Sequence, residues 1–296
     1  MTITSPAGAT AAPAAGPIID RTGVYEMTNE QYHADPVPGG SLSSTGARRL
    51  LAPSCPALFQ HERTHGQAPR RTFDFGTAAH MQVLGVGPEI VKVKADNYRT
   101  AKAQAERDEA RLRGAVPLLP AEWAQVQAMA AAIRQHPVAS RLFAPGSGLP
   151  EQSLFWVDQA TGVWRRCRPD WLPYPTGGRL IVPDYKTTVS ADPRSIEKSV
   201  YDYGYYQQDP WYVDGIRAVL GVEDVVMVFV CQEKTAPYLI NVVQLDPLAI
   251  RVGRRRNREA LAVYQQCTAS GQWPGYSDRV EVVSLPAWAE KQENQK

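Results

Sequence analysis

The chain has 296 residues, of which 44% are hydrophobic and 21% are charged, and its formal net charge is +2. This composition is that of an ordinary globular protein, and the length suits one elaborated α/β domain. The small net charge excludes recognition of an anionic partner by an overall field, so such a partner would have to meet a local basic patch.

The four cysteines, at positions 55, 167, 231 and 267, include no Cys-x-x-Cys pair. Their spacing argues against a zinc ribbon, an iron–sulfur cluster and a disulfide scaffold, and it favours a reducing, cytoplasmic location. No apolar run approaches the roughly 20 residues of a membrane span, so no membrane partner is expected. The first segment, MTITSPAGATAAPAAGP, lacks the basic start and apolar core of a secretory signal. It predicts a disordered Ala/Pro tail over residues 1–20.

The first part of the chain after this tail is predicted to be mainly helical, over 41–143. Residues 41–65 predict short helices interrupted by prolines, with Ser43 or Ser44 as an N-cap. The stretch FDFGTAAHMQVLG predicts a helix that ends at Gly85. EIVKVK predicts a short strand, and two further helices are expected at 101–113 and 120–135.

From residue 150 the pattern changes to strands, and a sheet core is predicted over 150–245. SLFWVD and VWRRCRPDWL alternate around the turn Thr161-Gly162 and predict a hairpin, and RLIVPDYKTT predicts a third strand. A Tyr-rich helix is expected at 194–219, then the strands DVVMVFVCQ and YLINVVQL, and then a basic helix at 247–269 that ends at Gly271. Strands bracketed by helices predict one α/β domain with a mixed sheet, over residues 21–296.

The third strand carries an unusual charged pair, Asp184 and Lys186. Side chains two residues apart on a strand point to the same face. Pro183 cannot donate to a ladder, so it predicts an edge strand or a bulge at that point. Asp170 begins a second arm, and the turn PYPTGG joins it to the strand of Asp184. This second predicted hairpin can therefore bring both carboxylates to one end of the sheet.

Two carboxylates at one point suit Mg²⁺ or Mn²⁺, and the main-chain carbonyl of Tyr185 is a candidate third oxygen ligand. A lysine beside the metal, here Lys186, can stabilise developing charge on a phosphate or orient the attacking water. Asp170, Asp184 and Lys186 are thus the set that metal-dependent phosphodiester hydrolysis requires. The alternative is a surface salt bridge between Asp184 and Lys186 without catalytic meaning.

Ordered sequence blocks around this pair resemble the PD-(D/E)XK nucleases of the RecB-like branch, and in particular the RecE-type exodeoxyribonuclease VIII domain of phages and prophages. The blocks are YHADP…SLSSTGARRLL, FGTAAH, EQSLFW, CRPDWL, IVPDYKTT and GYYQQDPWYVDG. The resemblance covers roughly residues 25 to 245. It implies a restriction-endonuclease-like core, with a mixed β-sheet flanked by helices and an N-terminal helical elaboration.

The resemblance also implies roles for individual residues. They are His80 as a helical metal ligand, Glu151 at the opening of the first core strand, Asp170 as the first metal carboxylate, Asp184 and Lys186 as the (D/E)-x-K pair, and Gln208 and Tyr212 as a Q-x-x-x-Y pair on the next helix. The last two lie four residues apart, on one helix face. However, Asp209-Pro210 is typical of an N-cap followed by Pro at the first helical position, and a helix that starts there leaves Gln208 outside it. If the helix starts at Tyr206 instead, Pro210 still falls near the first turn, where proline is tolerated.

Three other patterns have competing interpretations. HERTH, His61 to His65, matches the H-E-x-x-H pattern of zinc proteases, but Gly66 and Pro69 end the helix and no third ligand is evident. The five arginines of RVGRRRNR predict either a solvated helix face or contacts with DNA phosphates. The aromatic residues between Tyr201 and Trp211 could pack in the core or stack on unpaired bases.

The function predicted from the sequence is a Mg²⁺-dependent DNA exonuclease in the cytosol of a bacterial host. By resemblance, it would resect one strand of linear duplex DNA from 5′ to 3′ and hand the single strand to an annealing protein, and toroidal homo-oligomers are usual among such enzymes. Two alternatives stay open: an endonuclease on the same fold, and a non-catalytic DNA- or protein-binding module that retains it.

Overall fold

The computed structural model describes residues 17–65 and 71–293. Most of the tail predicted for residues 1–20 therefore lies outside the described residues. Ile19, however, is fully buried, and its amide donates a hydrogen bond to the carbonyl of Pro36. The folded part of the chain therefore begins no later than Ile19.

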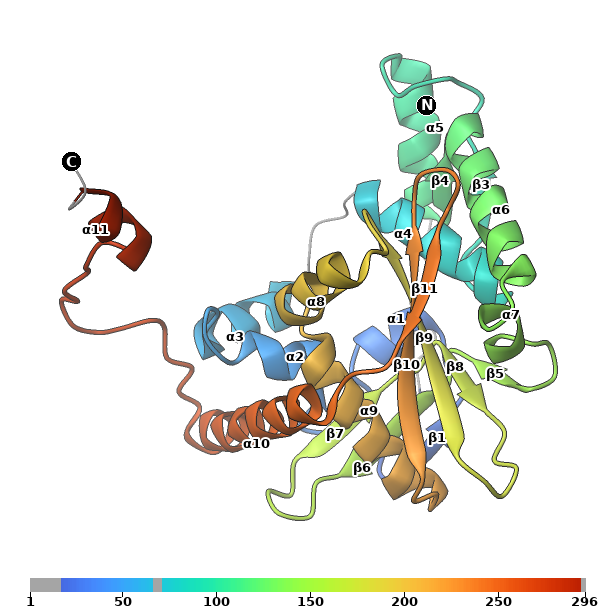
Figure 1. The fold of residues 1–296 in the computed structure, drawn as a ribbon. Helices are drawn as coiled ribbons and strands as arrows, with labels where there is room; N and C mark the ends of the chain where they lie inside the picture. Colours follow the sequence, from blue (N-terminus) through green and yellow to red (C-terminus); the bar gives the residue numbers. More distant parts are fainter. Residues whose placement is uncertain (1–16, 66–70, 294–296) are drawn as a thin grey trace, which may run out of the picture.

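The strand that carries the charged pair lies in a three-stranded sheet of order β11-β10-β9 (Figure 1). β9 (Leu180–Thr188) runs parallel to β10 (Val225–Glu233), and β11 (Ile240–Val243) pairs with β10 in the antiparallel sense. β9 is at an edge of this sheet, as Pro183 predicts, because a missing N–H costs no ladder bond there.

The hairpin predicted around Thr161-Gly162 is present in a second, four-stranded sheet of order β1-β6-β7-β2. β6 (Ser153–Val157) and β7 (Trp164–Cys167) pair antiparallel, β1 (Gly23–Tyr25) extends one edge, and β2 (Leu42–Ser43) joins the other in parallel. Two small ladders complete the strands: β5 (Gly148–Pro150) with β8 (Trp171–Pro173), and β3 (Ile90–Lys92) with β4 (Val116–Leu118). The mixed α/β class predicted from the sequence is therefore confirmed.

The main core lies where α9 (Tyr205–Leu220) packs between the two larger sheets and α10 (Pro247–Ser270). Trp211 of α9 is fully buried and contacts Trp156 of β6 edge to face, with 6.3 Å between the ring centroids. The Tyr-rich segment expected as one helix is two, α8 (Pro193–Asp202) and α9. Gly204 separates them in a left-handed conformation, φ +73°, which ends one helix and opens the next.

The remaining helices, apart from α11, form the predicted N-terminal elaboration. They are α1 (Asn29–His33), α2 (Ser44–Arg49), α3 (Pro56–His65), α4 (Arg71–Leu84), α5 (Ala101–Leu112), α6 (Pro120–Gln135) and α7 (Ala139–Leu142), with α11 (Ala287–Glu293) near the C-terminus. Ser43 caps α2 by accepting a hydrogen bond from the amide of Gly46. Figure 1 shows α4, α5 and α6 beside one end of the β11-β10-β9 sheet, while α2 and α3 lie near α10. Within the described residues, no helix combines the length and apolarity needed to cross a bilayer.

The expected N-cap at Asp209-Pro210 is wrong. α9 begins at Tyr205, so Pro210 lies inside the helix, and Asp209 is buried, which raises its pKa to about 7. Pro210 has no N–H for the carbonyl of Tyr206, four residues before it. Gly253 of α10 lies against that carbonyl so closely that an added Cβ would be 1.6 Å from the oxygen. The absence of a side chain at Gly253 is what allows α10 to pack over this irregular turn of α9.

Gly253→Ala should therefore lower the free energy of unfolding by about 2–3 kcal/mol, because the added methyl group meets rigid backbone. Gly178→Ala is the matched control, since nothing lies within 4 Å of its added Cβ. That variant should stay within about 0.5 kcal/mol of the parent. Urea denaturation of both variants checks this, and equal midpoints would show that α10 does not rest on the Tyr206 carbonyl.

Candidate active site

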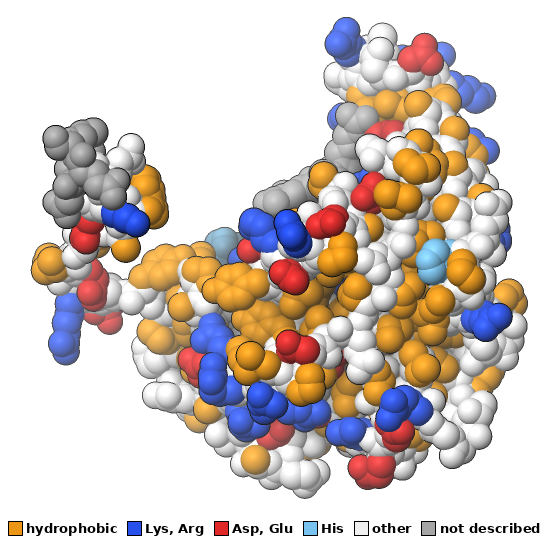
Figure 2. Space-filling view, viewed as in Figure 1, with side chains coloured by type: hydrophobic (Ala, Val, Ile, Leu, Met, Phe, Trp, Pro, Cys, Tyr) orange, Lys and Arg blue, Asp and Glu red, His pale blue; other side chains and the backbone are white. Residues whose placement is uncertain are grey.

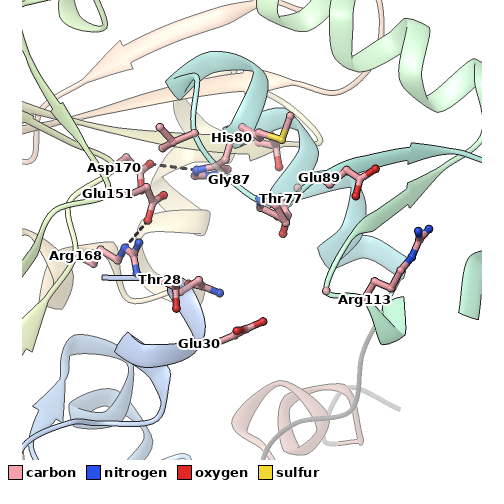
Figure 3. A pocket seen from close by; sticks show the side chains of 17 residues that line it. Thr28, Glu30, Thr77, His80, Gly87, Glu89, Arg113, Glu151, Arg168 and Asp170 are labelled. Carbon is pink, nitrogen blue, oxygen red and sulfur yellow. Dashed lines mark ion pairs between the residues drawn. The ribbon is translucent and has the colours of Figure 1, made fainter. Parts of the chain in front are cut away.

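Three side chains from separate parts of the sequence converge beside the middle of β9. His80 comes from α4, Glu151 from the junction of β5 and β6, and Asp170 from the residue before β8. One ligand atom from each lies within 4.8 Å of the other two, and His80 Nδ1 is 3.4 Å from Asp170 Oδ2. Figure 3 shows the three side chains pointing toward one another at one side of a cavity.

Asp170 is fixed to the strand that carries Asp184. The backbone amide of Tyr185 donates a 2.7 Å hydrogen bond to Asp170 Oδ2. Burial raises the pKa of Asp170, while Lys186 and the Tyr185 amide oppose that rise. Asp170 is thus anchored to β9 next to Asp184. The hairpin predicted between their segments is not formed, however, because β8, which follows Asp170, pairs with β5, whereas β9 pairs with β10.

Asp184 and Lys186 lie on the same face of β9 and form an ion pair, with 2.6 Å between Lys186 Nζ and Asp184 Oδ2. The Asp184 side chain is only 2% exposed, and burial raises its pKa to about 6 against the attraction of Lys186. Burial alone would lower the pKa of Lys186, but Asp184 and Asp170 outweigh it and leave the pKa above its ordinary value. Lys186 is therefore a cation in this site at every physiological pH.

Gln208 and Tyr212 both lie on α9, because that helix starts earlier than Asp209-Pro210 suggests. Gln208 Nε2 donates a 2.5 Å hydrogen bond to Asp184 Oδ1. Tyr212 lies in the same neighbourhood, and burial holds its pKa well above 10, so it is a neutral phenol. The side chain of Tyr185 is buried and donates to Gln232 Oε1, and the role of its carbonyl as a metal ligand stays a prediction.

Arg168 is a site residue that the sequence reasoning missed. Its Nε lies 2.7 Å from Glu151 Oε2, and its Nη2 donates to the carbonyl of Met27 (Figure 3). Burial and Asp170 raise the pKa of Glu151 to about 7, and Arg168 opposes them. Glu151 itself has a left-handed backbone, φ +52°, so the ion pair helps to hold a strained residue. Arg168 lies two residues before Asp170 in the segment VWRRCRPDWL, which was predicted to be a strand. Side chains two residues apart on a strand share a face, so this spacing could have identified Arg168 as a site residue.

The site residues line two separate hollows. His80, Glu151, Arg168 and Asp170 line a cavity of about 980 Å³, which extends to Glu89 and Arg113 at its far side (Figure 3). A smaller, polar hollow of about 140 Å³ contains Lys186 and Gln208 together with residues of α2 and the α8–α9 junction. Asp184 contacts Lys186 and Gln208, and it is not part of the group formed by His80, Glu151 and Asp170, so its role as a metal ligand stays a prediction.

The donor set fits a hard divalent cation. Asp170 and Glu151 offer carboxylate oxygens, which are the ligands that Mg²⁺ and Mn²⁺ prefer. Burial, and then Lys186, lower the pKa of His80 to about 4, so its imidazole is neutral and can donate a lone pair to a metal. Among the described residues, no other group of at least three such side chains is close enough to share an ion.

The zinc-protease pattern has no such arrangement. His61 and His65 lie on the last turns of α3, exposed, with their rings stacked at 4.2 Å between centroids. The helix ends at His65 in the described part of the chain, and neither histidine belongs to the candidate metal group. The protease interpretation therefore has no structural support.

The arginine cluster of α10 is divided. Arg254 pairs with Asp214, and Arg256 contacts Glu259 and the carbonyl of Ala52. Three of the arginines, at positions 251, 255 and 258, are exposed. Figure 2 shows Lys and Arg side chains on the surface where Figure 1 places α10. Arg254 and Arg256 therefore take part in contacts within the protein, whereas the three exposed arginines present positive charge to solvent.

Comparisons with known proteins identify a family and a similar fold for this chain. The model of a family described as "PDDEXK-like domain of unknown function (DUF3799)" matches residues 43–286. A crystal structure described as a "Putative exonuclease" from Eubacterium rectale has a TM-score of 0.57 at 12% identity, over 90% of this chain and 98% of that chain. Another, described only as SSO0001, has 15% identity over 68% of this chain and 85% of that chain, with a TM-score of 0.28. No curated protein matches the chain. The chain has a restriction-endonuclease-like fold and belongs to the family of PDDEXK-like domains of unknown function, DUF3799.

Proposed function

We propose that this protein is a divalent-metal-dependent deoxyribonuclease that hydrolyses phosphodiester bonds at the ends of linear duplex DNA. The observation that carries the proposal is the meeting of Asp170, Asp184 and Lys186 at the middle of β9, beside His80 and Glu151. A scaffold or binding role needs none of these buried charges, which cost desolvation energy.

The bound cation, Mg²⁺ or Mn²⁺, would supply Lewis acidity and a water of lowered pKa, held by Asp170, Asp184, His80 and the carbonyl of Tyr185. The chain's own groups provide the rest. Lys186 presents a fixed positive charge to the phosphate as negative charge develops on it. Gln208 and the Tyr185 amide hold the two carboxylates in position.

Glu151 has a distinct place in this arrangement. Its pKa of about 7 allows its carboxyl group to take up or release a proton near neutral pH, beside the metal ligands. Arg168 holds that carboxyl group at the edge of the large cavity. We assign Glu151 to water positioning or proton transfer and Arg168 to positioning Glu151.

Action on ends, 5′ to 3′ polarity, an annealing partner and a ring-shaped homo-oligomer are parts of the proposal supported by the resemblance to RecE-type domains. The Eubacterium rectale protein, described as a "Putative exonuclease", shares the fold. In the same proposal, the protein acts in the bacterial cytosol.

The test is a comparison of linear duplex DNA with a covalently closed circle of the same sequence, in Mg²⁺. Both attract basic patches equally, because non-specific affinity depends on the phosphate backbone. An exonuclease should release acid-soluble nucleotides from the linear form and leave the circle intact. Prompt nicking of the circle would instead favour an endonuclease on the same fold, and binding of both without cleavage would favour a non-catalytic module.

His80→Ala should weaken the response to metal. We expect a rise of about 10-fold or more in the Mg²⁺ concentration for half-maximal activity, because the variant lacks the imidazole that is proposed to bind the metal beside Asp170. The gain in thermal midpoint on adding Mg²⁺ should shrink in parallel.

The matched control is the double change His61→Ala, His65→Ala, which removes the two imidazoles of α3. It should leave both metal responses unchanged, because these rings contact each other and the end of α3. Equal losses in His80→Ala and in the double variant would place the metal site elsewhere.

A further inference from the structure

Two tyrosines at the junction of α8 and α9 are unusually exposed for large aromatic side chains. Tyr201 is 75% exposed and Tyr203 is 63% exposed. The junction is a tight one: Tyr203 caps α8, and Gly204 turns the chain directly into α9. An added Cβ at Gly204 would lie 2.5 Å from Arg48 Cδ, so the turn also rests on the side chain of Arg48.

Each exposed ring lies over a second ring. Tyr201 stacks on Tyr206 with 6.1 Å between centroids and 7° between planes, and Tyr203 stacks on Tyr205 at 5.9 Å and 27°. Tyr205 in turn stacks on the fully buried Phe229, at 5.2 Å and 17°. The result is a column of three rings that runs from the core to solvent and ends in the outer face of Tyr203. A ring supported in this way presents a flat apolar face at little cost in side-chain entropy.

This column stands beside the proposed catalytic cation. Lys186 Nζ is 5.1 Å from the centroid of the Tyr205 ring. Tyr203, Lys186, Arg48 and Gln208 line the same small polar hollow. A flat aromatic face and two cations therefore share one surface.

We propose that Tyr203, supported by Tyr205 and Phe229, is a stacking platform for an unpaired nucleobase of the strand whose phosphate lies at Lys186, and that Tyr201 with Tyr206 extends the platform. The ligand class is single-stranded DNA or the unpaired end of a duplex. Every base has a π-face, so such a platform binds without sequence preference. The adjacent cations Lys186 and Arg48 favour a polyanion over an uncharged protein surface.

The inference rests on the proposed nuclease function for the identity of the strand, but its test does not need cleavage. Binding of a labelled 12-nucleotide DNA strand is measured by fluorescence anisotropy in the absence of divalent metal, with the full chain. Tyr203→Ala should weaken binding by about 10-fold, and Tyr203→Phe, which keeps the ring, should retain wild-type affinity. Tyr174→Ala removes another exposed tyrosine, 48% exposed, which lines neither of the two hollows, and this variant should bind as the parent does.

A second strand with the same phosphates but abasic sugars separates stacking from charge. The wild type should bind the abasic strand about 10-fold more weakly than the normal one, and Tyr203→Ala should bind both alike. Equal binding of the two strands by the wild type would overturn the platform, as would unchanged affinity in a folded Tyr203→Ala. If the protein cleaves linear DNA but binds the normal and abasic strands equally, the platform is refuted and the nuclease proposal stands. If it binds the normal strand more tightly than the abasic strand but does not cleave DNA, the nuclease proposal is refuted and the platform stands.

Discussion

Asp184→Asn should lower the rate of DNA cleavage by about 10³-fold or more. An amide has nearly the same size as the carboxyl group and can stay in contact with Gln208, but it cannot carry the charge that would hold a cation. Lys186→Met should lower the rate by about 10²–10³-fold, because the positive charge beside the phosphate is lost. Cleavage of an end-labelled linear duplex under single-turnover conditions measures both.

Stability separates a catalytic role from a structural one in these variants. Asp184 and Lys186 form a partly buried ion pair, so removing one partner leaves the other charge uncompensated and lowers the thermal midpoint. The double variant Asp184→Asn, Lys186→Met removes both charges, and it should recover stability relative to the single variants while remaining inactive. Wild-type activity per folded molecule in either single variant would refute the assignment.

A matched control comes from an ion pair outside the site. Arg179 and Asp224 pair at 3.0 Å on the surface, with both side chains more than half exposed. Asp224→Asn should change neither the cleavage rate nor, by more than about 1 kcal/mol, the free energy of unfolding. The contrast between Asp184→Asn and Asp224→Asn isolates the effect of location from that of losing a carboxylate.

Removal of divalent metal should abolish cleavage entirely, and added Mg²⁺ or Mn²⁺ should restore it. The proposed ligands Asp170, Asp184 and His80 combine carboxylate oxygens with a neutral imidazole, which suits these ions. Ca²⁺ should bind but support little turnover, because its larger and looser coordination shell places water poorly. A chelator titration followed by re-addition of each ion measures this directly.

A readout other than activity identifies the metal site. Mg²⁺ or Ca²⁺ should raise the thermal midpoint of the wild type, because a ligand that binds only the folded state stabilises it. Asp170→Asn should lose this rise, while Asp224→Asn should retain it. Full activity in excess chelator would contradict the metal hypothesis, whatever the stability measurements show.

The sequence by itself determined the class of fold and the order of its main elements. Alternation in SLFWVD and VWRRC marked the hairpin, Pro183 marked an edge strand, and Gly271 marked the end of α10, because these signals are local. The two-residue spacing of Asp184 and Lys186 also predicted their shared face, since strand geometry alone fixes it.

Where local signals competed, the sequence reasoning failed. Asp209-Pro210 is a good helix start, yet α9 begins at Tyr205, because the left-handed Gly204 and the burial of Trp211 determine where the helix lies. The missing N–H of Pro210 is tolerated where Gly253 of α10 lies against the Tyr206 carbonyl, a contact between residues far apart in the chain.

Only the tertiary structure decided which residues meet at the site. The approach of His80 to Asp170, the hold of the Tyr185 amide on Asp170, and the pairing of Arg168 with Glu151 join segments whose spacing carries no signal of contact. Burial, likewise, is a property of the packed chain: it raises the pKa of Asp184 and Glu151, and it divides the tyrosines into core and surface. Residue types and short spacings specify which chemistry is available, whereas distances between distant segments and exclusion of water are set by packing.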